Sequence, residues 1–488
     1  MSKLYRDVLY LITEELQNDE NALRSCLLVN KTWSEIIIPI LWKNPWKYLK
    51  SGNEKLLLKV IISHLSEKSK ENLSIRFKHL MNSSYERPLF DYISFCKHFN
   101  INEIERIIKT VDKKSKIKII KDEIYNLFIN ENTKFTHLYI PYQFDRQLHL
   151  IPGVDKCFSE IRFLSCNAKI NLNVLPGLIE VFKSIRELEL SIGASNNKYE
   201  IIRLIKTSKN LVKIRLLNEY YSERSYCKNL EQTLANHADN ILYLKLTKQP
   251  ITNFVFSFVN LKVLVLNDSY HRYTNWNVLK DLSLPHLQIL KTSGIQHGIL
   301  MNIIKNSGGN LIELKIDDFY PYDCDIGIIM HTISQSCPNL KYLKFPRYVD
   351  FLHLEKLLIN CKDLMGLYFN FDNSYLNTYV HWDNFFETLA KSSPINLFRF
   401  KFQLYEAPEL KSLKLFFDNW KGRHPMLLQI IQDKDNLNFH AINTMRRYYD
   451  LIEKSKAEGI VKKYDDNLNG ITFKDFEWIQ KRVEKRKA

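Results

Sequence analysis

The chain has 488 residues, 45% of them hydrophobic, so it can bury a large core and is not a disordered tail. Lysine and arginine number 70 against 54 aspartate and glutamate, and the net charge of +16 favours acidic partners without naming one. The eight cysteines are scattered, with no CxxC pair, which excludes a small secreted domain held by disulfides. We expect them to be reduced and mostly buried.

The first residues, MSKLYRDVLYLITEELQ, carry acidic side chains inside an apolar stretch and lack a small-residue cleavage site, so they do not read as a signal peptide. No apolar run approaches the roughly 20 residues of a membrane span. We therefore expect a soluble protein of the cytoplasm, the nucleus or both, with no membrane partner.

The first predicted helix has an unusually wide apolar side. At about 100° per residue its apolar side chains cover an arc of roughly 160°, wider than the usual stripe of about 100°. They are Leu4, Val8, Leu9, Leu11, Ile12 and Leu16. Two further helical stretches follow at 22–30 and 31–38. A unit of roughly 40 residues rarely supplies enough core alone, so we expect it to share apolar surface with a partner.

The next segment, residues 49–130, is predicted to be a helical connector that caps the repeats. Apolar residues three and four apart in NEKLLLKVIISHL and INEIERIIKT indicate one-sided helices, and Pro88 suits a helix start.

Residues 131–430 contain a repeat in which apolar residues occupy positions 1, 4 and 6 of a hexamer. The eleven hexamers begin at Phe135, Ile161, Ile185, Leu211, Ile241, Leu261, Leu287, Leu311, Leu340, Leu364 and Leu397. Their spacings run from 20 to 33 residues, and most fall in the range of about 20 to 29 that is typical of leucine-rich repeats. A chance origin in a leucine-rich helical protein would not give this spacing, nor the turn residues that precede several hexamers, as in CPNL at 337–340.

Each repeat is predicted to be a strand, a turn, a helix and a turn. Positions 4 and 6 point to one side of a short strand, and stretches between hexamers such as DIGIIMHTISQSC have helical spacing. Because one unit cannot bury its apolar face, the units must stack. The predicted fold is an α/β solenoid, a horseshoe with parallel strands on its concave side, preceded by a small all-α unit at 1–48 and the connector.

The repeat signal fades after Gln429, and residues 431–488 are predicted to form a charged helical tail. A calcium-loop-like stretch begins at Asp465, but Phe476 stands where the loop requires a carboxylate, and Glu477 comes one residue late. We therefore predict no metal site there.

The N-terminal residues resemble the F-box, the docking motif of substrate receptors in SCF-type ubiquitin ligases, and the repeats complete the familiar F-box plus leucine-rich-repeat arrangement. The matching residues are Leu4, Asp7 to Leu9, Leu11, Ile12, Leu16 and Cys26 to Trp33. Tyr5 stands where the family usually has proline. The resemblance implies binding to a Skp-family adaptor and a cullin-based ligase complex, with Trp33 packed inside the three-helix unit. The implied adaptor-binding residues are Leu4, Tyr5, Val8, Leu9, Ile12, Leu16, Leu28 and Trp33. The alternative is a helical cap of the solenoid without a partner.

Hexamer position 5 faces the concave side and is rich in basic residues. Six of its eleven residues are basic and one is acidic, where composition predicts roughly one or two basic residues, or about three at exposed sites. We hypothesise that this face binds an acidic or phosphorylated segment of an unknown target protein; the alternative is a lysine-rich face that only interacts with water. The candidate target-binding residues are Tyr139, Arg215, Tyr243, Lys245, Lys291, Lys315, Tyr342, Lys344, Tyr368 and Lys401.

Motifs for catalysis or cofactors are missing from the sequence. It contains no GxxxxGK loop, GxGxxG turn, HExxH helix or GxSxG elbow, and no cysteine and histidine at zinc spacing. We expect a non-catalytic protein without cofactor. Two other functions stay open: binding of nucleic acid by the basic face and tail, for which no recognised motif exists, and a scaffold without a ligase role.

Overall fold

The computed structural model describes residues 5–17, 19–74, 88–110, 117–193, 197–218, 223–268, 275–317, 319–320, 326–346, 351–371, 381–404, 408–432 and 439–465. Leu4, Cys324 and residues 466–488, with Phe476 and Glu477, lie outside these ranges. The chain divides into two compact units, Met1–Thr233 and Leu234–Ala488, which are described separately.

The first unit begins with the three helices predicted at the N-terminus, α1 (Arg6–Leu16), α2 (Glu20–Leu27) and α3 (Lys31–Trp42). The Asp19 side chain accepts the N–H of Ala22 at 3.0 Å, and that of Asn30 accepts the N–H of Trp33 at 3.1 Å. These N-caps satisfy donors that the first helical turn leaves unpaired, and so fix where α2 and α3 begin.

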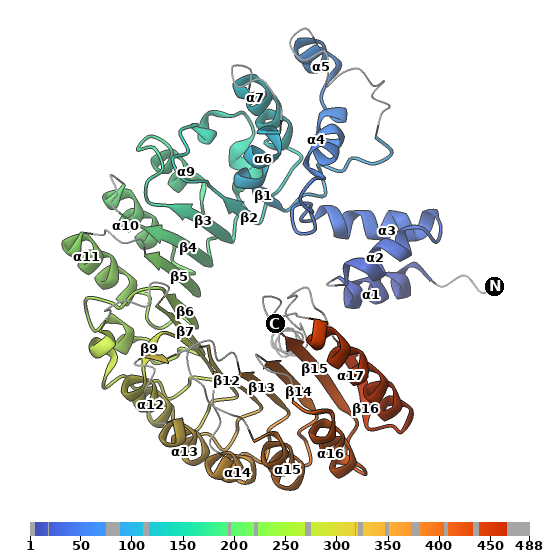
Figure 1. Cartoon of the computed structure of the whole chain (residues 1–488). Coiled ribbons are helices and arrows are strands. Elements are labelled where there is room, and N and C mark those ends of the chain that lie inside the picture. The colour runs from blue at the N-terminus through green and yellow to red at the C-terminus, as the bar shows by residue number, and fades with distance from the viewer. Residues whose placement is uncertain are drawn as a thin grey trace. The chain divides into compact units, whose positions relative to one another are not determined.

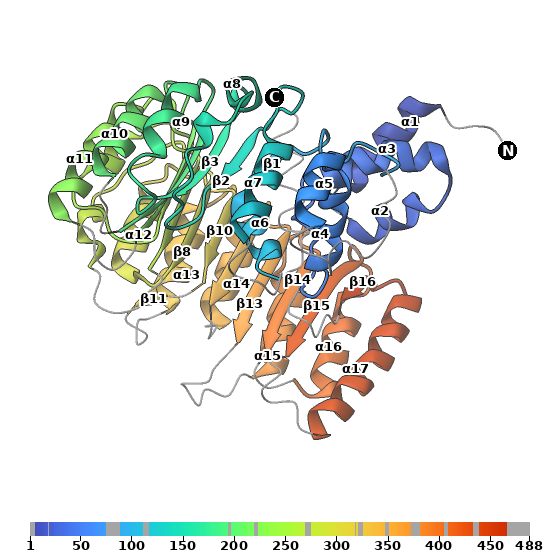
Figure 2. The same ribbon diagram turned by 90° about the horizontal axis from the view of Figure 1, so that it is seen from above.

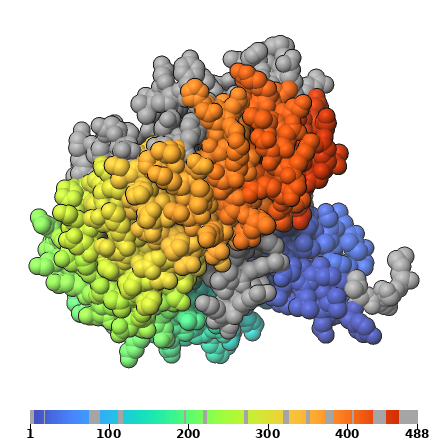
Figure 3. All heavy atoms as spheres, turned by 90° about the horizontal axis from the view of Figure 1, so that it is seen from below, coloured from blue at the N-terminus to red at the C-terminus, as the bar shows by residue number. Residues whose placement is uncertain are grey.

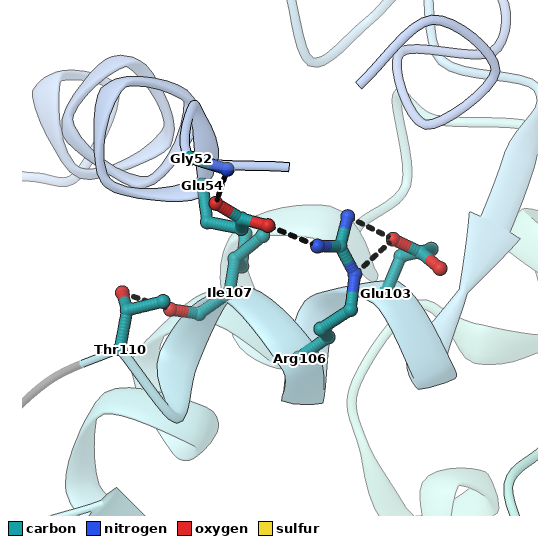
Figure 4. Close-up of polar contacts among 6 residues, drawn as sticks. All are labelled: Gly52, Glu54, Glu103, Arg106, Ile107 and Thr110. Atoms are coloured by element: carbon teal, nitrogen blue, oxygen red, sulfur yellow. Dashed lines mark hydrogen bonds and ion pairs between the residues drawn. The ribbon is translucent and has the colours of Figure 1, made fainter. Parts of the chain in front are cut away.

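The connector contains helices α4 (Glu54–Ser63), α5 (Glu67–Ser74), α6 (Ile101–Ile108) and α7 (Ile117–Phe128). Helices α4 and α5 lie beside α6 and α7 (Figures 1 and 2). Figure 4 shows Arg106 of α6 between two carboxylates: it pairs with Glu54 of α4 and, at 2.7 Å, with Glu103 of its own helix. Glu54 also accepts the N–H of Gly52 at 2.7 Å, so this ion-pair cluster joins the start of α4 to α6.

Strands and helices then alternate as the repeat predicts. The elements are β2 (His137–Tyr139), η2 (Leu148–Leu150), α8 (Val154–Phe158), β3 (Phe163–Asn167), α9 (Leu175–Val181), β4 (Glu187–Ile192), α10 (Lys198–Thr207), β5 (Lys213–Asn218) and α11 (Arg224–Ala235). Strands β2 to β5 pair in parallel and in chain order. Helices α9, α10 and α11 cover one face of these strands (Figure 1).

The second unit repeats this pattern. Its elements are β6 (Tyr243–Leu246), η3 (Phe254–Ser257), β7 (Val263–Asn267), η4 (Trp276–Leu279), β8 (Ile289–Ser293), β9 (Ile295–Gln296), α12 (His297–Lys305), β10 (Glu313–Ile316), β11 (Phe319–Tyr320), α13 (Ile326–Ser336), β12 (Tyr342–Pro346), α14 (Phe351–Asn360), β13 (Gly366–Phe371), α15 (Trp382–Ser392), β14 (Arg399–Leu404), α16 (Leu410–Trp420), β15 (Met426–Gln432), α17 (Phe439–Ala457) and β16 (Val461–Asp465). The other strands from β6 to β16 pair in parallel in one sheet, and β9 and β11 pair in parallel in a separate two-stranded sheet. Figure 3 shows one side of this unit as spheres, coloured from green through yellow to red.

Both units are therefore α/β solenoids of the leucine-rich-repeat type, as predicted. Hexamer positions 4 and 6 are buried in every repeat; Leu188 and Leu190, for example, are fully inaccessible. Position 1 is equally buried, so each repeat contributes three side chains to the layer between strands and helices, and all of them are apolar except Thr292. Positions 3 and 5 lie on the opposite side of the strands, which we call the strand face.

Strand β1 (His98–Asn100) was not predicted, although it pairs in parallel with β2. It lies in the connector and belongs to an unrecognised hexamer, CKHFNI, in which Cys96, Phe99 and Ile101 occupy positions 1, 4 and 6 and are all fully buried. Cysteine replaces the expected leucine at position 1, so the apolar pattern is weaker there.

Two strands also extend the second unit beyond the predicted repeats. In β15, Pro425 occupies position 1, whereas Leu428 and Ile430 at positions 4 and 6 are buried. Strand β16 pairs with β15 after helix α17, so the segment predicted as a helical tail contains a helix and a further strand.

Candidate functional site

The apolar arc of α1 divides into a buried half and an exposed half. Leu9 is 4% exposed and Thr13 is fully buried, since this side of the helix packs inside the three-helix unit. The other side leaves Val8 40%, Leu11 62% and Ile12 37% exposed. With Tyr5, which is 82% exposed, these residues form a continuous line along the helix that we call the α1 stripe. An apolar line in water is typical of a surface that binds a partner.

The other predicted docking residues differ in how far they are exposed. Leu16 and Trp33 are half-buried, so Trp33 packs only partly inside the unit. Leu28 is 89% exposed in the turn between α2 and α3. Leu9 supports the fold of the three-helix unit from inside and does not reach the surface on which a partner would bind.

The three-helix unit is attached to the first strand of the solenoid by Trp46. This residue is 7% exposed, and its indole N–H donates to the carbonyl oxygen of His98 in β1 at 2.7 Å. The N–H of Lys97 donates to the carbonyl of Lys43 at 2.9 Å. The Tyr48 hydroxyl donates to the carbonyl of Gln17 at 3.0 Å. Sequence reasoning missed this anchor, because no periodic pattern marks a single tryptophan after a helix.

The strand face of the first unit begins with a cluster of rings. The imidazoles of His98 and His137 stack with centroids 3.8 Å apart, and the ring of Tyr139 lies 5.0 Å from that of Phe163. Burial lowers the pKa of His98 to about 3 and the pKa of His137 to about 4, so both rings are neutral at pH 7. Burial also raises the pKa of Tyr139 to about 12.

These histidines give the protein a pH-dependent stability. In the unfolded chain both rings bind a proton below about pH 6.5. In the folded chain His137 binds a proton only near pH 4, and His98 only near pH 3. Over this range each ring lowers the free energy of unfolding by up to about 1.4 kcal/mol for every pH unit of acidification. We expect about half of this value, because both rings are partly exposed. The free energy of unfolding should therefore fall by about 2 kcal/mol between pH 6.5 and pH 5, measured by urea denaturation.

The matched variant replaces both histidines with phenylalanine, which keeps the stacked rings and removes the titration. Its stability should change less over the same pH range, whereas His286→Gln, at an exposed position, should behave like the wild type. If the free energy of unfolding of the double variant still fell with pH as steeply as that of the wild type, these histidines would not be the cause.

Basic residues at the end of the first unit are already paired with acidic ones. Glu187 lies 3.1 Å from the Nζ of Lys213 and 3.6 Å from the Nη1 of Arg215. The predicted candidates Tyr139 and Arg215 are half-buried on this strand face. Its acidic residues, Glu187 and Glu189, offset the charge of Lys213 and Arg215, so this part of the strand face is not strongly basic.

The strand face of the second unit carries a row of lysines on neighbouring strands. Lys291, Lys315 and Lys344 lie opposite one another in β8, β10 and β12. Their side chains are 30%, 20% and 19% exposed. Glu313, which is 2% exposed, pairs with Lys291 at 3.4 Å and with Lys315 at 3.0 Å, and Lys344 pairs with Asp317.

The row continues across β13 and β14 as a lysine, a tyrosine and a lysine. Tyr368 is in register with Lys344 on one side and Lys401 on the other. The two Nζ atoms lie 4.6 and 4.5 Å from its ring centroid, which is a cation–π arrangement. Lys401 is only 5% exposed, so it supports Tyr368 from within.

The remaining candidates, Tyr243 and Lys245, are half-buried in β6.

Arg399 on β14 completes this surface. Its Nη1 donates at 3.1 Å to the hydroxyl of Tyr342 on β12, crossing β13 where Gly366 has no side chain. Its Nε is buried and has no hydrogen-bond partner. Within the described ranges no carboxylate pairs with Arg399. Arg399 occupies position 3 of its hexamer, and the strand register shows that its side chain reaches across three strands.

The described cysteines are all unbonded, and six of the seven are buried. Burial raises the pKa of Cys96, Cys337 and Cys361 to about 12, which keeps these thiols protonated at neutral pH. Among the residues that the structure describes, no group of three or more histidine, cysteine or acidic side chains could hold a metal ion. In the same ranges no helix is long and apolar enough to cross a membrane.

Comparison with known proteins gives low similarities. No family model matches the sequence, and no curated protein matches it. Among solved structures, the chain is similar to the complex of Rad7 and Elc1 in yeast, with a TM-score of 0.40 and 12% identity over 69% of this chain and 86% of that one. It is also similar to the leucine-rich repeat-containing protein LegL7 from Legionella pneumophila, with a TM-score of 0.36 and 13% identity over 62% of this chain and 89% of that one. These scores are low, so the fold assignment rests on the strand pairing and the buried repeat positions.

Proposed function

We propose that this chain is a non-catalytic substrate-recognition subunit of an SCF-type ubiquitin ligase. The α1 stripe binds the Skp-family adaptor, and the strand faces of the repeats bind the target protein. The observation that carries the proposal is the exposure of Val8, Leu11 and Ile12 along one side of a helix whose other side is buried. A helical cap without a partner has no physical need to keep these side chains in water.

The attachment of the three-helix unit supports the same role. A substrate receptor has to hold its target at a defined position relative to the ligase, which requires a firm connection between its two binding surfaces. Trp46 and the backbone bond between Lys97 and Lys43 supply such a connection to β1. The Glu54–Arg106–Glu103 cluster holds α4 against α6 behind it.

The test is co-purification of the full chain with a Skp-family adaptor. Replacing Val8 and Ile12 by glutamate places two charges in the α1 stripe and should reduce adaptor capture at least about tenfold, since each buried apolar contact contributes about 1.5–3 kcal/mol. The stripe is exposed in the free protein, so the variant should fold normally.

Tyr10→Glu is the matched control. Tyr10 is 53% exposed on the same helix but points away from the stripe, and its replacement should leave adaptor capture unchanged. Equal capture by the stripe variant and the wild type would refute the docking surface. If the stripe variant and Tyr10→Glu both lost capture, adaptor binding would depend on the fold or the charge of α1 and not on the α1 stripe.

A further inference from the structure

A hollow of about 400 Å³ opens at the edge of the second unit where strands β6, β7 and β8 begin, and we call it the β6–β8 hollow. Sites that bind small molecules typically measure about 300–1,000 Å³. None of its seven lining residues belongs to the strand face, and six of them are polar, with Leu242 as the exception. A polar lining disfavours an apolar ligand, because the polar groups would lose their contact with water without gaining partners.

Residues at hexamer position 2 form one side of the hollow. Leu242, Lys262 and Gln288 stand directly before the paired residues of β6, β7 and β8, so the sheet register places them side by side. The N–H of Lys262 donates to the carbonyl oxygen of Leu242 at 3.0 Å, and the N–H of Gln288 donates to that of Lys262 at 2.9 Å. These backbone bonds fix this side of the hollow without any ligand.

Residues just before the hexamers form the other side. Asn260 donates through Nδ2 to the carbonyl oxygen of Asp239 at 3.2 Å, and Asn310 donates to that of Pro285 at 2.7 Å. The exposed His286 precedes the β8 hexamer. Each of the two bonds joins a repeat to the one before it, so these residues are held in place before a ligand binds.

The hollow contains one negative and one positive side chain that do not pair with each other. Asp239 is exposed and Lys262 is half-buried. Within the described part of the chain, neither has an ion-pair partner. On the strand face of the same unit, by contrast, Lys315 pairs with Glu313 at 3.0 Å. A ligand that covers the hollow has to compensate both charges, since removing a charge from water is unfavourable.

We propose that the β6–β8 hollow binds a small zwitterion, either a free amino acid or a short peptide with both ends unblocked. Its ammonium group lies against Asp239 and its carboxylate lies against Lys262, and charge-assisted hydrogen bonds of this kind are strong. The amides of Gln288 and Asn310 and the imidazole of His286 can donate to or accept from the other polar atoms of the ligand. This binding site goes beyond the proposed function and does not rest on it.

Other classes of ligand fit the hollow less well. A phosphate compound would meet the carboxylate of Asp239, a simple cation would meet the ammonium of Lys262, and a neutral sugar would leave both charges uncompensated. A nucleotide would also lack a large ring on which to stack, because no phenylalanine, tyrosine or tryptophan lines the hollow.

The experiment titrates the full chain with leucine, glycyl-leucine and glycyl-glycyl-leucine by isothermal titration calorimetry. All three probes carry leucine because Leu242 offers one apolar contact. The matched blocked probes have an acetylated amino end or an amidated carboxyl end. We expect the best unblocked probe to bind at least about tenfold more tightly than either of its blocked forms, since each charge-assisted contact contributes roughly that factor. The probe length that binds best distinguishes a free amino acid from a short peptide.

Two single variants assign the two ends of the ligand. Asp239→Asn should remove the preference for a free amino end and keep the preference for a free carboxyl end, whereas Lys262→Gln should do the reverse. A misfolded variant would lose both preferences, so a loss at one end only is not an effect of stability. Asp281→Asn with Lys305→Gln, at exposed positions of the same unit, should keep both preferences.

Blocked probes that bind as tightly as unblocked ones, no binding of any unblocked probe, tighter binding of maltose, or loss of both preferences in one variant would each overturn the inference. A preference that survives the change of its own residue would do the same. Adaptor capture is measured separately and should be unchanged in every variant, because the hollow lies in the second unit and the α1 stripe in the first. Failure of docking alone would refute the proposed function and leave this result standing.

Discussion

Replacing Trp46 by alanine should lower the free energy of unfolding of the first unit by about 3–5 kcal/mol. Trp46 is 7% exposed, and its ring packs 6.2 Å from that of Phe128. The variant also leaves the carbonyl of His98, to which the indole donates, without that bond. Because the α1 stripe is not altered, adaptor capture should persist while the three-helix unit loses its fixed position against β1.

Trp46→Phe separates the contribution of the buried ring from that of the hydrogen bond to His98. It keeps most of the buried ring and removes the indole donor, so it should cost only about 1–2 kcal/mol. Urea denaturation gives both values, and hydrogen exchange at the amides of β1 reports the local loosening directly. Normal exchange in β1 of the alanine variant would show that the attachment depends mainly on the other contacts.

The solenoid could be predicted from the sequence because its repeat is a local pattern. Positions 1, 4 and 6 are apolar in nearly every hexamer and are buried in all eleven predicted hexamers, whereas Pro425 at position 1 of the β15 hexamer is half-buried. Burial of these positions is a property of any stacked strand, so no long-range information was needed. The pattern was missed where Cys96 or Pro425 stands at position 1, and β16 was missed because its segment was predicted to be helical.

The charge pairing on the strand face could not be predicted in this way. Glu313 is the shared partner of Lys315 on its own strand and of Lys291 on the neighbouring strand. The pair of Glu313 and Lys291 joins residues one repeat apart, and repeat lengths vary by several residues. Whether a basic residue is already neutralised therefore depends on the strand register, which only the structure supplies.

The docking helix shows the same limit at shorter range. A helical wheel identifies the wide apolar arc of α1, but it cannot tell which half α3 covers. The structure places Leu9 on the covered half and Ile12 on the exposed half. Two residues that the sequence analysis assigned to a single binding surface thus have different physical roles, and substitutions at the two positions should have different consequences.

Replacing Leu9 by aspartate should unfold the three-helix unit, because the change places an unpaired charge at a position that is 4% exposed. We expect a loss of about 4 kcal/mol or more, enough to abolish adaptor capture by melting α1 rather than by altering its surface. Leu9→Met, which conserves volume, should cost less than about 1.5 kcal/mol and preserve capture. Ile12→Glu should reduce capture while the helical circular dichroism stays normal. Folded Leu9→Asp protein that still binds the adaptor would contradict this division of α1 into a buried side and a binding side.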